Sequence, residues 1–298
     1  MALAKKVLLV EPKTFYSNPQ TAIDNNFQNE HSDQLKLLEF AKIEFTGLKK
    51  LLIDNGILVE VFQITDDLET PDAIFPNNWF STHSDGSLVL YPMKAINRRL
   101  ERRSEIIEML RSKYSKILDL SRNEDRGLYL EGTGSIVFDN QNKKAYATLS
   151  ERTSSNLLYE WSKKTNYETI TFSAYDSENK LIYHTNVMLS IGEGFCILCC
   201  ASISDTDEIR LVRKSFKETN HEIIDIDFNQ LKQFCGNCIQ LSNEHGERFL
   251  VMSTRAYNAF LPQQIKSLEK YTKIIHTPLD TIETYGGGGA RCMIAELF

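Results

Sequence analysis

The sequence predicts an α/β fold in which five strand, strand, helix, strand (ββαβ) units close into a ring. This order of elements recurs four times along the chain, and the two ends of the chain together supply a fifth copy. A polar or thiol residue also precedes each hairpin at an almost constant spacing. Repeats of this size are typical of architectures in which each unit packs only on its neighbours.

The four continuous units share one pattern. Each has two short apolar strands joined by a polar turn, then a helix, then a third strand. The expected hairpin, helix and strand are residues 79–93, 97–110 and 116–121 in the first unit, 134–150, 154–165 and 167–174 in the second, 187–202, 205–217 and 222–227 in the third, and 238–253, 261–270 and 272–278 in the fourth. No Pro-rich, Ser-rich or single-sign charged linker divides the chain, so we expect one domain over residues 1–298.

The fifth unit combines the two ends of the chain. Residues 7–12 and 57–64 are expected strands on either side of a helix over residues 35–54, which Asn55 and Gly56 are expected to end. The missing first strand comes from residues 292–298. Pairing of the first and last strands would close the ring.

Five residues stand just before the five hairpins: Asn78, Glu131, His184, Asn237 and Cys292. Successive differences between these residue numbers are 53, 53, 53 and 55. A ring brings equivalent positions toward one axis, so we expect Glu131, His184 and Cys292 to meet at one end of it. Turn residues are often polar by chance, but a carboxylate, an imidazole and a thiol together are the set that nucleophilic catalysis uses.

Composition is that of an ordinary globular protein. The 298 residues are 42% hydrophobic and 25% charged, with a formal net charge of −6. A net negative charge does not favour binding to nucleic acid or to an anionic membrane surface. The apolar stretches at residues 7–10 and 195–201 are too short for a secretion signal and a membrane span, respectively. We therefore expect a cytoplasmic location and reduced thiols for the six cysteines.

Several segments resemble the pentein, or amidinotransferase-like, superfamily. PDAIFPNN (71–78) is similar to the substrate loop of dimethylarginine hydrolases, and LEGTGSIVF and SERT are similar to two further segments of these enzymes. YHTNV resembles the catalytic histidine segment, and GGGGARCMIAELF the glycine-rich approach to a terminal cysteine. The resemblance implies a five-bladed α/β propeller with pseudo-fivefold symmetry. Arginine deiminases, agmatine deiminases and glycine amidinotransferases share that superfamily, and the citrulline-utilisation-type hydrolases are the most similar branch.

Two positions depart from the deiminase pattern. Deiminases have one aspartate in the first loop and another two residues after the histidine, and both bind the cationic guanidinium of the substrate. This sequence has Asn78 and Asn186 there. An amide can donate and accept hydrogen bonds but cannot neutralise a cation. The departures favour a neutral ureido substrate such as citrulline.

The expected chemistry centres on Cys292, the nucleophile. A thiol attacks only as thiolate, so it needs a neighbouring base or a lowered pKa. The unperturbed pKa of histidine lies near neutrality, so His184 is expected to transfer protons, and Glu131 is expected to orient the imidazole. A small buried hydrophobe is the alternative role for a cysteine.

The resemblance also implies substrate-binding residues. These are Asp72, Asn77, Asn78, Asn186, Arg99 or its neighbour Arg98, and Arg152. The arginines would clamp an α-carboxylate, for which a guanidinium fork is suited. A turn-forming role is the alternative for Asp72, and a solvated helix face is the alternative for the arginine run.

The remaining histidines and cysteines are interpreted as structural. They are His31, His83, His221, His245, His276, Cys196, Cys199, Cys200, Cys235 and Cys238. Cys235 and Cys238 form a CxxC, but no second pair completes a zinc site. We predict no metal and no cofactor.

The predicted function is hydrolysis of a C–N bond in a small guanidino or ureido compound through a covalent cysteine intermediate. Amidino transfer to an amine is the first alternative, and a noncatalytic binding module of the same fold is the second. No nucleic-acid or membrane partner is expected, and a homodimer is one option for the oligomeric state. Residues 18–34 and 123–130 are predicted lids, because functional loops tend to be long.

Overall fold

The computed structural model describes residues 3–25, 27–29 and 33–298. Within these residues the strands form five separate three-stranded sheets. In every sheet the central strand pairs antiparallel with one neighbour and parallel with the other. A parallel pair needs a crossover connection, and each crossover here contains helix, as the ββαβ pattern predicts.

The sheets follow the expected units. The first contains β15 (Ala295–Leu297), β1 (Lys6–Glu11) and β2 (Leu58–Gln63). The other four contain β3 (Phe80–Thr82), β4 (Ser87–Leu90) and β5 (Lys116–Asp119); β6 (Val137–Asp139), β7 (Lys144–Thr148) and β8 (Glu168–Phe172); β9 (Leu189–Gly192), β10 (Phe195–Leu198) and β11 (Glu222–Asp225); and β12 (Ile239–Ser242), β13 (Arg248–Ser253) and β14 (Lys273–Thr277).

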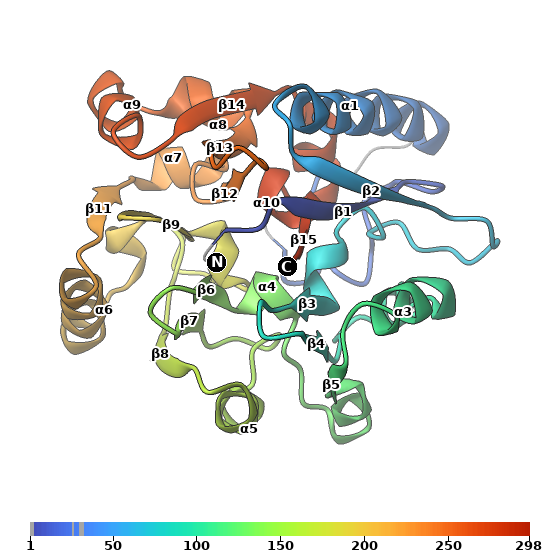
Figure 1. Ribbon diagram of the computed structural model, residues 1–298, viewed down its shortest axis with the longest axis horizontal. Helices are drawn as coiled ribbons and strands as arrows, with labels where there is room; N and C mark the ends of the chain where they lie inside the picture. The colour runs from blue at the N-terminus through green and yellow to red at the C-terminus, as the bar shows by residue number, and fades with distance from the viewer. Residues whose placement is uncertain (1–2, 26, 30–32) are drawn as a thin grey trace.

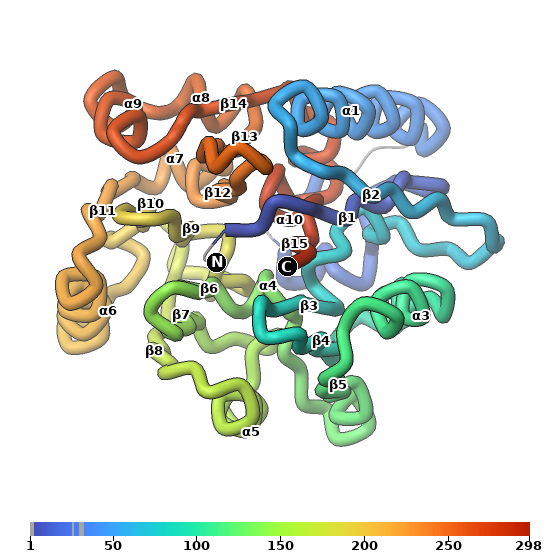
Figure 2. The backbone as a smooth tube through the Cα atoms, in the orientation of Figure 1, coloured from blue at the N-terminus to red at the C-terminus, as the bar shows by residue number. Residues whose placement is uncertain are grey.

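Longer helices cover the outside of the sheets (Figure 1). They are α1 (Gln34–Asp54), α3 (Ser104–Arg111), α5 (Ser155–Thr165), α6 (Thr206–Glu218), α8 (Thr254–Ala259) and α9 (Pro262–Leu268). The first strand of each sheet lies toward the centre, where β15 contacts β3 and β9 contacts both β6 and β12. The expected pairing of the chain ends is present, with Leu8 opposite Ala295 in the β1–β15 pair. Figure 2 shows β1 and β15 side by side near the middle of the molecule.

Short helical segments connect the outer helices and strands to the central region. They are η1 (Pro76–Asn78), α2 (Ile96–Arg99), η2 (Ser121–Arg126), α4 (Gly132–Ser135), η3 (Thr185–Val187), η4 (Cys200–Ser202), α7 (Phe228–Lys232), the π-helical turn η5 (Ile282–Gly286) and α10 (Ala290–Met293). Four of them, η1, α4, η3 and α10, stand directly before the first strand of a sheet. The expected site positions therefore lie on short turns at the centre.

One expected helix is divided. The sequence predicts a single helix over residues 97–110, whereas the chain forms α2 and α3 with a break at residues 100–103. Arg98 is buried and pairs with Glu101, and Arg103 donates to Asp66 and Thr70. The break places both arginines against buried acceptors, which a continuous solvated helix face does not do.

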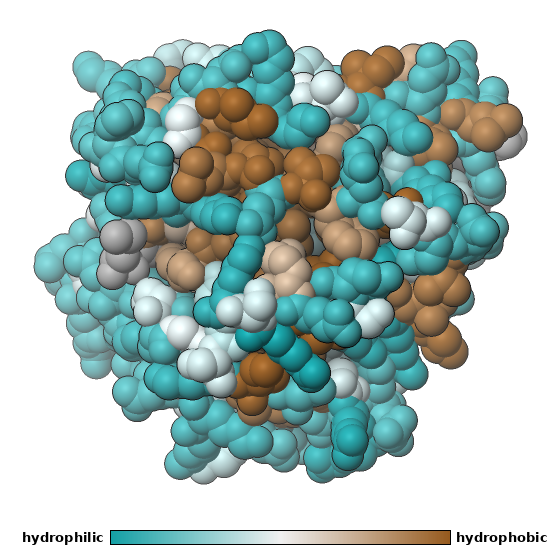
Figure 3. Space-filling view, turned by 45° about the vertical axis from the view of Figure 1, so that its right-hand side comes forward, coloured by the Kyte–Doolittle hydropathy of each residue, from teal (hydrophilic) through white to brown (hydrophobic). Residues whose placement is uncertain are grey.

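Apolar packing between helices and sheets holds these elements in place. The buried residues of α1 are Leu37, Ala41, Phe45, Leu48 and Leu52, a spacing that puts them on one face of a helix. They join a core cluster that also contains Met293 and Ile294, next to Cys292. Figure 3 shows one outer face, on which hydrophilic residues cover most of the surface and apolar residues gather in patches. No helix in the described part of the chain could span a membrane.

Replacing one core leucine of α1 tests this packing. We expect Leu48→Ala to lower the free energy of unfolding by about 2–5 kcal/mol, because Leu48 is fully buried and its removal leaves a cavity. Ile43→Ala on the same helix is the control, and it should change stability by less than about 0.5 kcal/mol because Ile43 is 62% exposed. Urea unfolding measures both, and equal losses would contradict the assigned faces.

Candidate active site

Most of the predicted site residues line one small cavity. Its free volume is about 20 Å³, which is room for about one water molecule. Thirteen residues line it: Thr21, Asn25, Asp72, Phe75, Asn78, Arg98, Arg152, Tyr183, His184, Gly286, Gly287, Gly288 and Cys292. Residues more than 200 positions apart in the sequence thus share one cavity.

Cys292 is presented by α10, just before β15. Its side chain is buried, and its Sγ accepts two hydrogen bonds from amide groups. Asn186 Nδ2 donates over 3.3 Å and Asn237 Nδ2 over 3.2 Å. The thiol is therefore held from two sides by neutral donors.

His184 lies on the turn before β9 and is joined to Glu131 on the turn before β6. The His184 Nε2 to Glu131 Oε2 distance is 2.8 Å. A carboxylate only accepts hydrogen bonds, so Nε2 carries the proton and Nδ1 carries the lone pair. Glu131 is fully buried, and its other oxygen accepts from the backbone N–H of Lys94 over 2.9 Å.

Burial and neighbouring charges act against one another on these three groups. Burial alone would raise the pKa of Glu131, but Arg152, His184 and Arg98 outweigh it and hold that pKa well below its ordinary value. Burial lowers the pKa of His184 despite the Glu131 carboxylate. Burial raises the pKa of Cys292, and the two asparagine donors offset only part of that rise. At neutral pH the carboxylate is thus charged, whereas the imidazole and the thiol are neutral.

Gly134 makes the approach of His184 possible. A Cβ at this position would lie 2.7 Å from His184 Nδ1 and 2.3 Å from Asn78 Nδ2. Both distances are far below contact, so only glycine fits. The glycine in the LEGTGSIVF segment thus leaves space where the imidazole and an amide come together.

Asp72 and Asn78 line the cavity with incompletely paired polar atoms. Asp72 Oδ2 accepts from Asn18 and Thr21, and Asn78 Oδ1 accepts from Arg98 over 2.8 Å. Within the described residues, Asp72 Oδ1 and Asn78 Nδ2 are buried without a hydrogen-bond partner. Such atoms are costly to bury unless a ligand satisfies them.

Of the two arginines considered in the 97–103 segment, Arg98 lies at the cavity and Arg99 does not. Arg98 is buried and contacts Asn78, Glu101 and the backbone oxygen of Phe75. Arg99 instead donates to the backbone oxygens of Met93 and Lys94 and lies near Glu124. Arg98 therefore lies at the cavity, where Arg99 was expected. The two side chains point to different sides because they are consecutive at the end of α2.

Arg152 lines the cavity, but protein groups already surround its guanidinium. It pairs with Asp24, donates to the backbone oxygen of Thr21 over 3.1 Å and lies 3.6 Å from Glu131. Its guanidinium also stacks over the ring of Tyr183. Arg152 thus links the 18–25 segment to the Glu131–His184 pair.

The other predicted binding residues lie behind the cavity wall. Asn77 Nδ2 donates to Thr133 Oγ1 over 3.1 Å, and Asn186 directs its Nδ2 to Cys292. Asn237 was noted for its repeat position, but no role was predicted for it. The spacing of 53 residues was the signal that could have identified it. Thr21, Asn25 and Tyr183 carried no such signal.

The two predicted lids differ in position. Two residues of the 18–25 segment, Thr21 and Asn25, line the cavity, and Gln28 donates to the backbone oxygen of Gly286. Residues 26 and 30–32 of this predicted lid lie outside the described residues. Residues 123–130 do not line the cavity, and Glu124 there pairs with Arg102.

The remaining histidines and cysteines lie elsewhere. His83 is buried against Ser81, burial lowers its pKa to about 4, and His276 stacks on Tyr257. His31 lies outside the described residues. Cys235 and Cys238 are buried free thiols, and no group of three or more potential metal ligands was found in the described chain.

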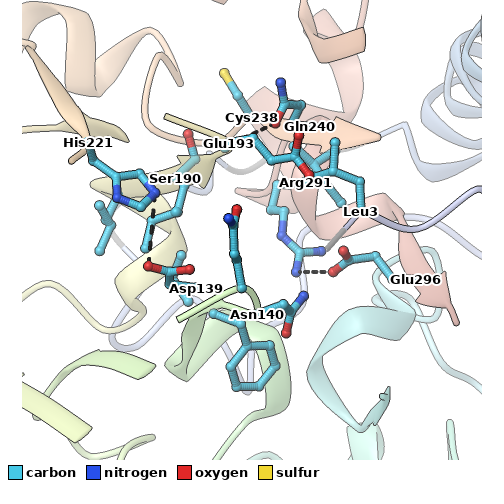
Figure 4. A pocket seen from close by; sticks show the side chains of 17 residues that line it. Leu3, Asp139, Asn140, Ser190, Glu193, His221, Cys238, Gln240, Arg291 and Glu296 are labelled. Atoms are coloured by element: carbon cyan, nitrogen blue, oxygen red, sulfur yellow. Dashed lines mark hydrogen bonds and ion pairs between the residues drawn. The ribbon is translucent and has the colours of Figure 1, made fainter. Parts of the chain in front are cut away.

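A second polar cavity lies on the other side of the Cys292 backbone. Arg291 lines this cavity, whereas Cys292 lines the first. Figure 4 shows Arg291 directed toward Glu296 and His221 beside Asp139. Arg291 and Cys292, which are consecutive in α10, thus line different cavities.

Comparison with known proteins extends these observations. A family model described as N,N dimethylarginine dimethylhydrolase, eukaryotic, matches residues 11–298. No curated protein sequence matches significantly.

Three solved structures illustrate the similarity in fold. The apo form of ArgZ, an arginine dihydrolase from the ornithine-ammonia cycle in Cyanobacteria, has 16% identity and a TM-score of 0.76; the match covers 97% of this chain and 40% of that one. The N-terminal domain of an ArgZ variant, covalently bound to a reaction intermediate, has 17% identity and a TM-score of 0.76, with 98% and 97% coverage. An adduct of a dimethylarginine dimethylaminohydrolase variant with S-methyl-L-thiocitrulline has 15% identity and a TM-score of 0.66, with 99% and 100% coverage.

The chain thus spans about two fifths of full-length ArgZ, and nearly all of its N-terminal domain. The family model covers almost the whole sequence, and the expected pentein relationship is confirmed. This chain belongs to the N,N dimethylarginine dimethylhydrolase family of the pentein superfamily.

Proposed function

We propose that this protein is a cysteine-dependent hydrolase that breaks a C–N bond in a guanidino or ureido derivative of an amino acid. The observation that carries the proposal is the shared cavity of Cys292 and His184, with His184 bonded to the buried Glu131 carboxylate. A nucleophile, a base and an orienting carboxylate are the groups that covalent catalysis requires. The family match supports the same reaction class.

In the proposed reaction, the Cys292 proton passes to His184 Nδ1 and Sγ attacks the central carbon of the substrate. The C–N bond then breaks, and the imidazolium gives its proton to the leaving nitrogen. Water loses a proton to the same imidazole and adds to the carbon. The S–C bond breaks, and the thiol is restored by that proton. No cofactor takes part in these steps.

Glu131 is proposed to stabilise the imidazolium that forms during each proton transfer. Its carboxylate accepts from Nε2 and keeps the lone pair on Nδ1. Arg152 and the Lys94 backbone N–H satisfy the carboxylate, so it does not need to take a proton itself.

The unpaired atoms of the cavity favour a ureido group over a guanidinium. Arg98 can only donate, so Asn78 must turn its oxygen to Arg98 and leave Nδ2 as a free donor. A ureido oxygen can accept from this donor, whereas a guanidinium has only N–H groups. Asp72 Oδ1 is a free acceptor that suits the N–H groups of either. Citrulline is therefore the substrate we favour.

A guanidino amino acid is the second candidate. Asp72 supplies a negative charge in the cavity, and ArgZ, which shares the fold, is an arginine dihydrolase. Amidino transfer differs only in the acceptor, since an amine would replace water at the second step.

We also infer that the five sheets are the blades of a closed propeller and that residues 1–298 form one catalytic domain. The β1–β15 pairing and the contacts of β9 with β6 and β12 support this interpretation.

A substrate panel tests the chemical class. We expect ammonia release from citrulline, and little release of ammonia from arginine or agmatine or of dimethylamine from dimethylarginine, because the free Asn78 Nδ2 can only donate, whereas a guanidinium has only N–H groups. Omitting and adding an acceptor amine separates hydrolysis from transfer. Turnover of arginine without citrulline would contradict the ureido assignment but leave the cysteine mechanism intact.

Replacing the histidine tests the proton-transfer role. His184→Ala should lower kcat by about 10²–10⁴-fold, the usual contribution of a general acid or base. His276→Ala is the control, since His276 lies outside the cavity and should keep nearly full activity. Circular dichroism of both variants checks folding, and similar activity in the two would argue against the role of His184.

The pH profile of kcat/KM follows from the shifted pKa values. In the reactive form of the enzyme, Cys292 Sγ and His184 Nδ1 together carry one proton. Activity should therefore rise as the pH passes the lowered pKa of His184, below 6.5, and fall only above the raised pKa of Cys292, beyond 9.0. Initial rates between pH 4 and pH 11 measure this broad plateau, and a sharp optimum at neutral pH would conflict with it.

A further inference from the structure

Asn237 contacts the proposed nucleophile directly, although it lies outside the set of residues predicted to act. Its Nδ2 lies 3.2 Å from Cys292 Sγ, and Asn186 Nδ2 lies 3.3 Å from the same atom. Both asparagines are at least 98% buried. Two buried amide donors thus converge on one buried sulfur.

The orientation of the Asn237 amide is fixed by the backbone around it. Its Oδ1 accepts from the Gly289 N–H over 3.1 Å, and its Nδ2 also donates to the Asn186 carbonyl over 2.9 Å. A backbone N–H only donates and a backbone carbonyl only accepts, so the amide cannot be reversed. The remaining N–H of Asn237 must point toward the sulfur.

We propose that Asn237 is a positioning residue that, together with Asn186, holds Cys292 and stabilises its thiolate through two neutral hydrogen bonds. A hydrogen bond to an ionised acceptor is about twice as strong as one to a neutral acceptor. The two amides therefore favour the thiolate over the thiol. Their effect is large because little water reaches the buried sulfur.

Whether the hydrogen-bond donors to Cys292 are neutral or charged bears on which substrate can bind beside the sulfur. A cationic guanidinium bound beside the sulfur would itself favour the thiolate. A neutral ureido group cannot do so, and the protein must then supply the stabilisation. Asn186 and Asn237 supply it without adding a charge that would attract or repel substrate. The benefit to a ureido substrate rests on the proposed function, whereas the two hydrogen bonds to Cys292 do not depend on it.

The other cysteines provide a comparison within the chain. Burial raises the pKa of Cys199 to about 11 and that of Cys200 to about 12. Cys235 donates its S–H to a backbone oxygen, which favours the neutral thiol. Cys292 is as deeply enclosed as these thiols, but two amide N–H groups point at it.

Asn237 also ties together three segments, so a structural role alone must be separated from thiolate stabilisation. The measurement is the rate of iodoacetamide alkylation of Cys292 as a function of pH, followed by mass spectrometry of the peptide that contains it. Only the thiolate reacts, so the midpoint of the profile reports the thiol pKa. No substrate is needed.

We expect Asn237→Asp to move the midpoint upward by at least about one pH unit. The substitution keeps the shape of the side chain, removes both donors and adds a negative charge, and a hydrogen bond to a charged group contributes about 1.5–3 kcal/mol. Asn186→Ala removes the other donor and leaves the Asn237 contacts in place, so it should also raise the midpoint. This second variant keeps the test decisive if Asn237→Asp does not fold.

Asn243→Asp is the matched control. Asn243 is equally buried but lies in the β12–β13 turn, where it accepts from the backbone of His245 and Glu247. Its substitution should leave the Cys292 midpoint unchanged. In the wild type, Cys292 should react at a lower pH than the five other thiols.

The outcomes separate this inference from the proposed function. An unchanged midpoint in folded Asn237→Asp and Asn186→Ala would overturn the inference, even if citrulline is hydrolysed. A raised midpoint in both variants would support it, even if none of the compounds in the panel is turned over.

Discussion

The antiparallel pairing of β1 with β15 is the contact on which the rest of the site depends. α10 leads directly into β15, so the register of Leu8 opposite Ala295 fixes where Cys292 lies. A slip of one residue would turn every side chain of β15 to the other face of the sheet. Tyr114 and Thr82 of the neighbouring unit also bond to this final segment, at Phe298 and Glu296. The pairing therefore joins Cys292, the proposed nucleophile, to elements from the beginning of the chain.

Charged side chains at the centre of the fold are paired with opposite charges in two clusters. In one, Arg98 contacts Glu101 and lies 3.7 Å from Asp72; in the other, Arg152 contacts Asp24 and Glu131. Removing one partner of such a pair costs about 3–5 kcal/mol because the other charge remains buried. The unsatisfied atoms Asp72 Oδ1, Asn78 Nδ2 and Asn186 Oδ1 lie beside these clusters. The charged side chains around the cavity are thus largely paired, whereas these three polar atoms have no hydrogen-bond partner among the described residues.

The sequence was sufficient to predict the repeats and the pairing of Glu131 with His184, because both follow from regular spacing. The division of α2 from α3 was not predictable, since the arginine run has the charge pattern of an exposed helix. It turns inward where Asp72 and Thr70 of another segment, together with Glu101 of the run itself, offer buried acceptors. The same reason explains the choice of Arg98 over Arg99. The contact of Asn237 with Cys292 depends on the path of the glycine run, which composition does not determine.

The 18–25 segment forms part of the cavity wall through Thr21 and Asn25. An amino acid with a ureido group does not fit into about 20 Å³, so at least one wall must move. Gly287 is closely packed, since a Cβ there would lie 2.4 Å from Asn25. The segment is held by Asn18 and Thr21 on Asp72 and by Asp24 on Arg152. Arg152 also lowers the pKa of Glu131 more than any other charged group, and Glu131 is hydrogen-bonded to His184. If Asp24 moves away, Glu131 is the remaining carboxylate partner of Arg152. A movement of the 18–25 segment would therefore change the ion pair between Arg152 and Glu131, the carboxylate that is hydrogen-bonded to His184.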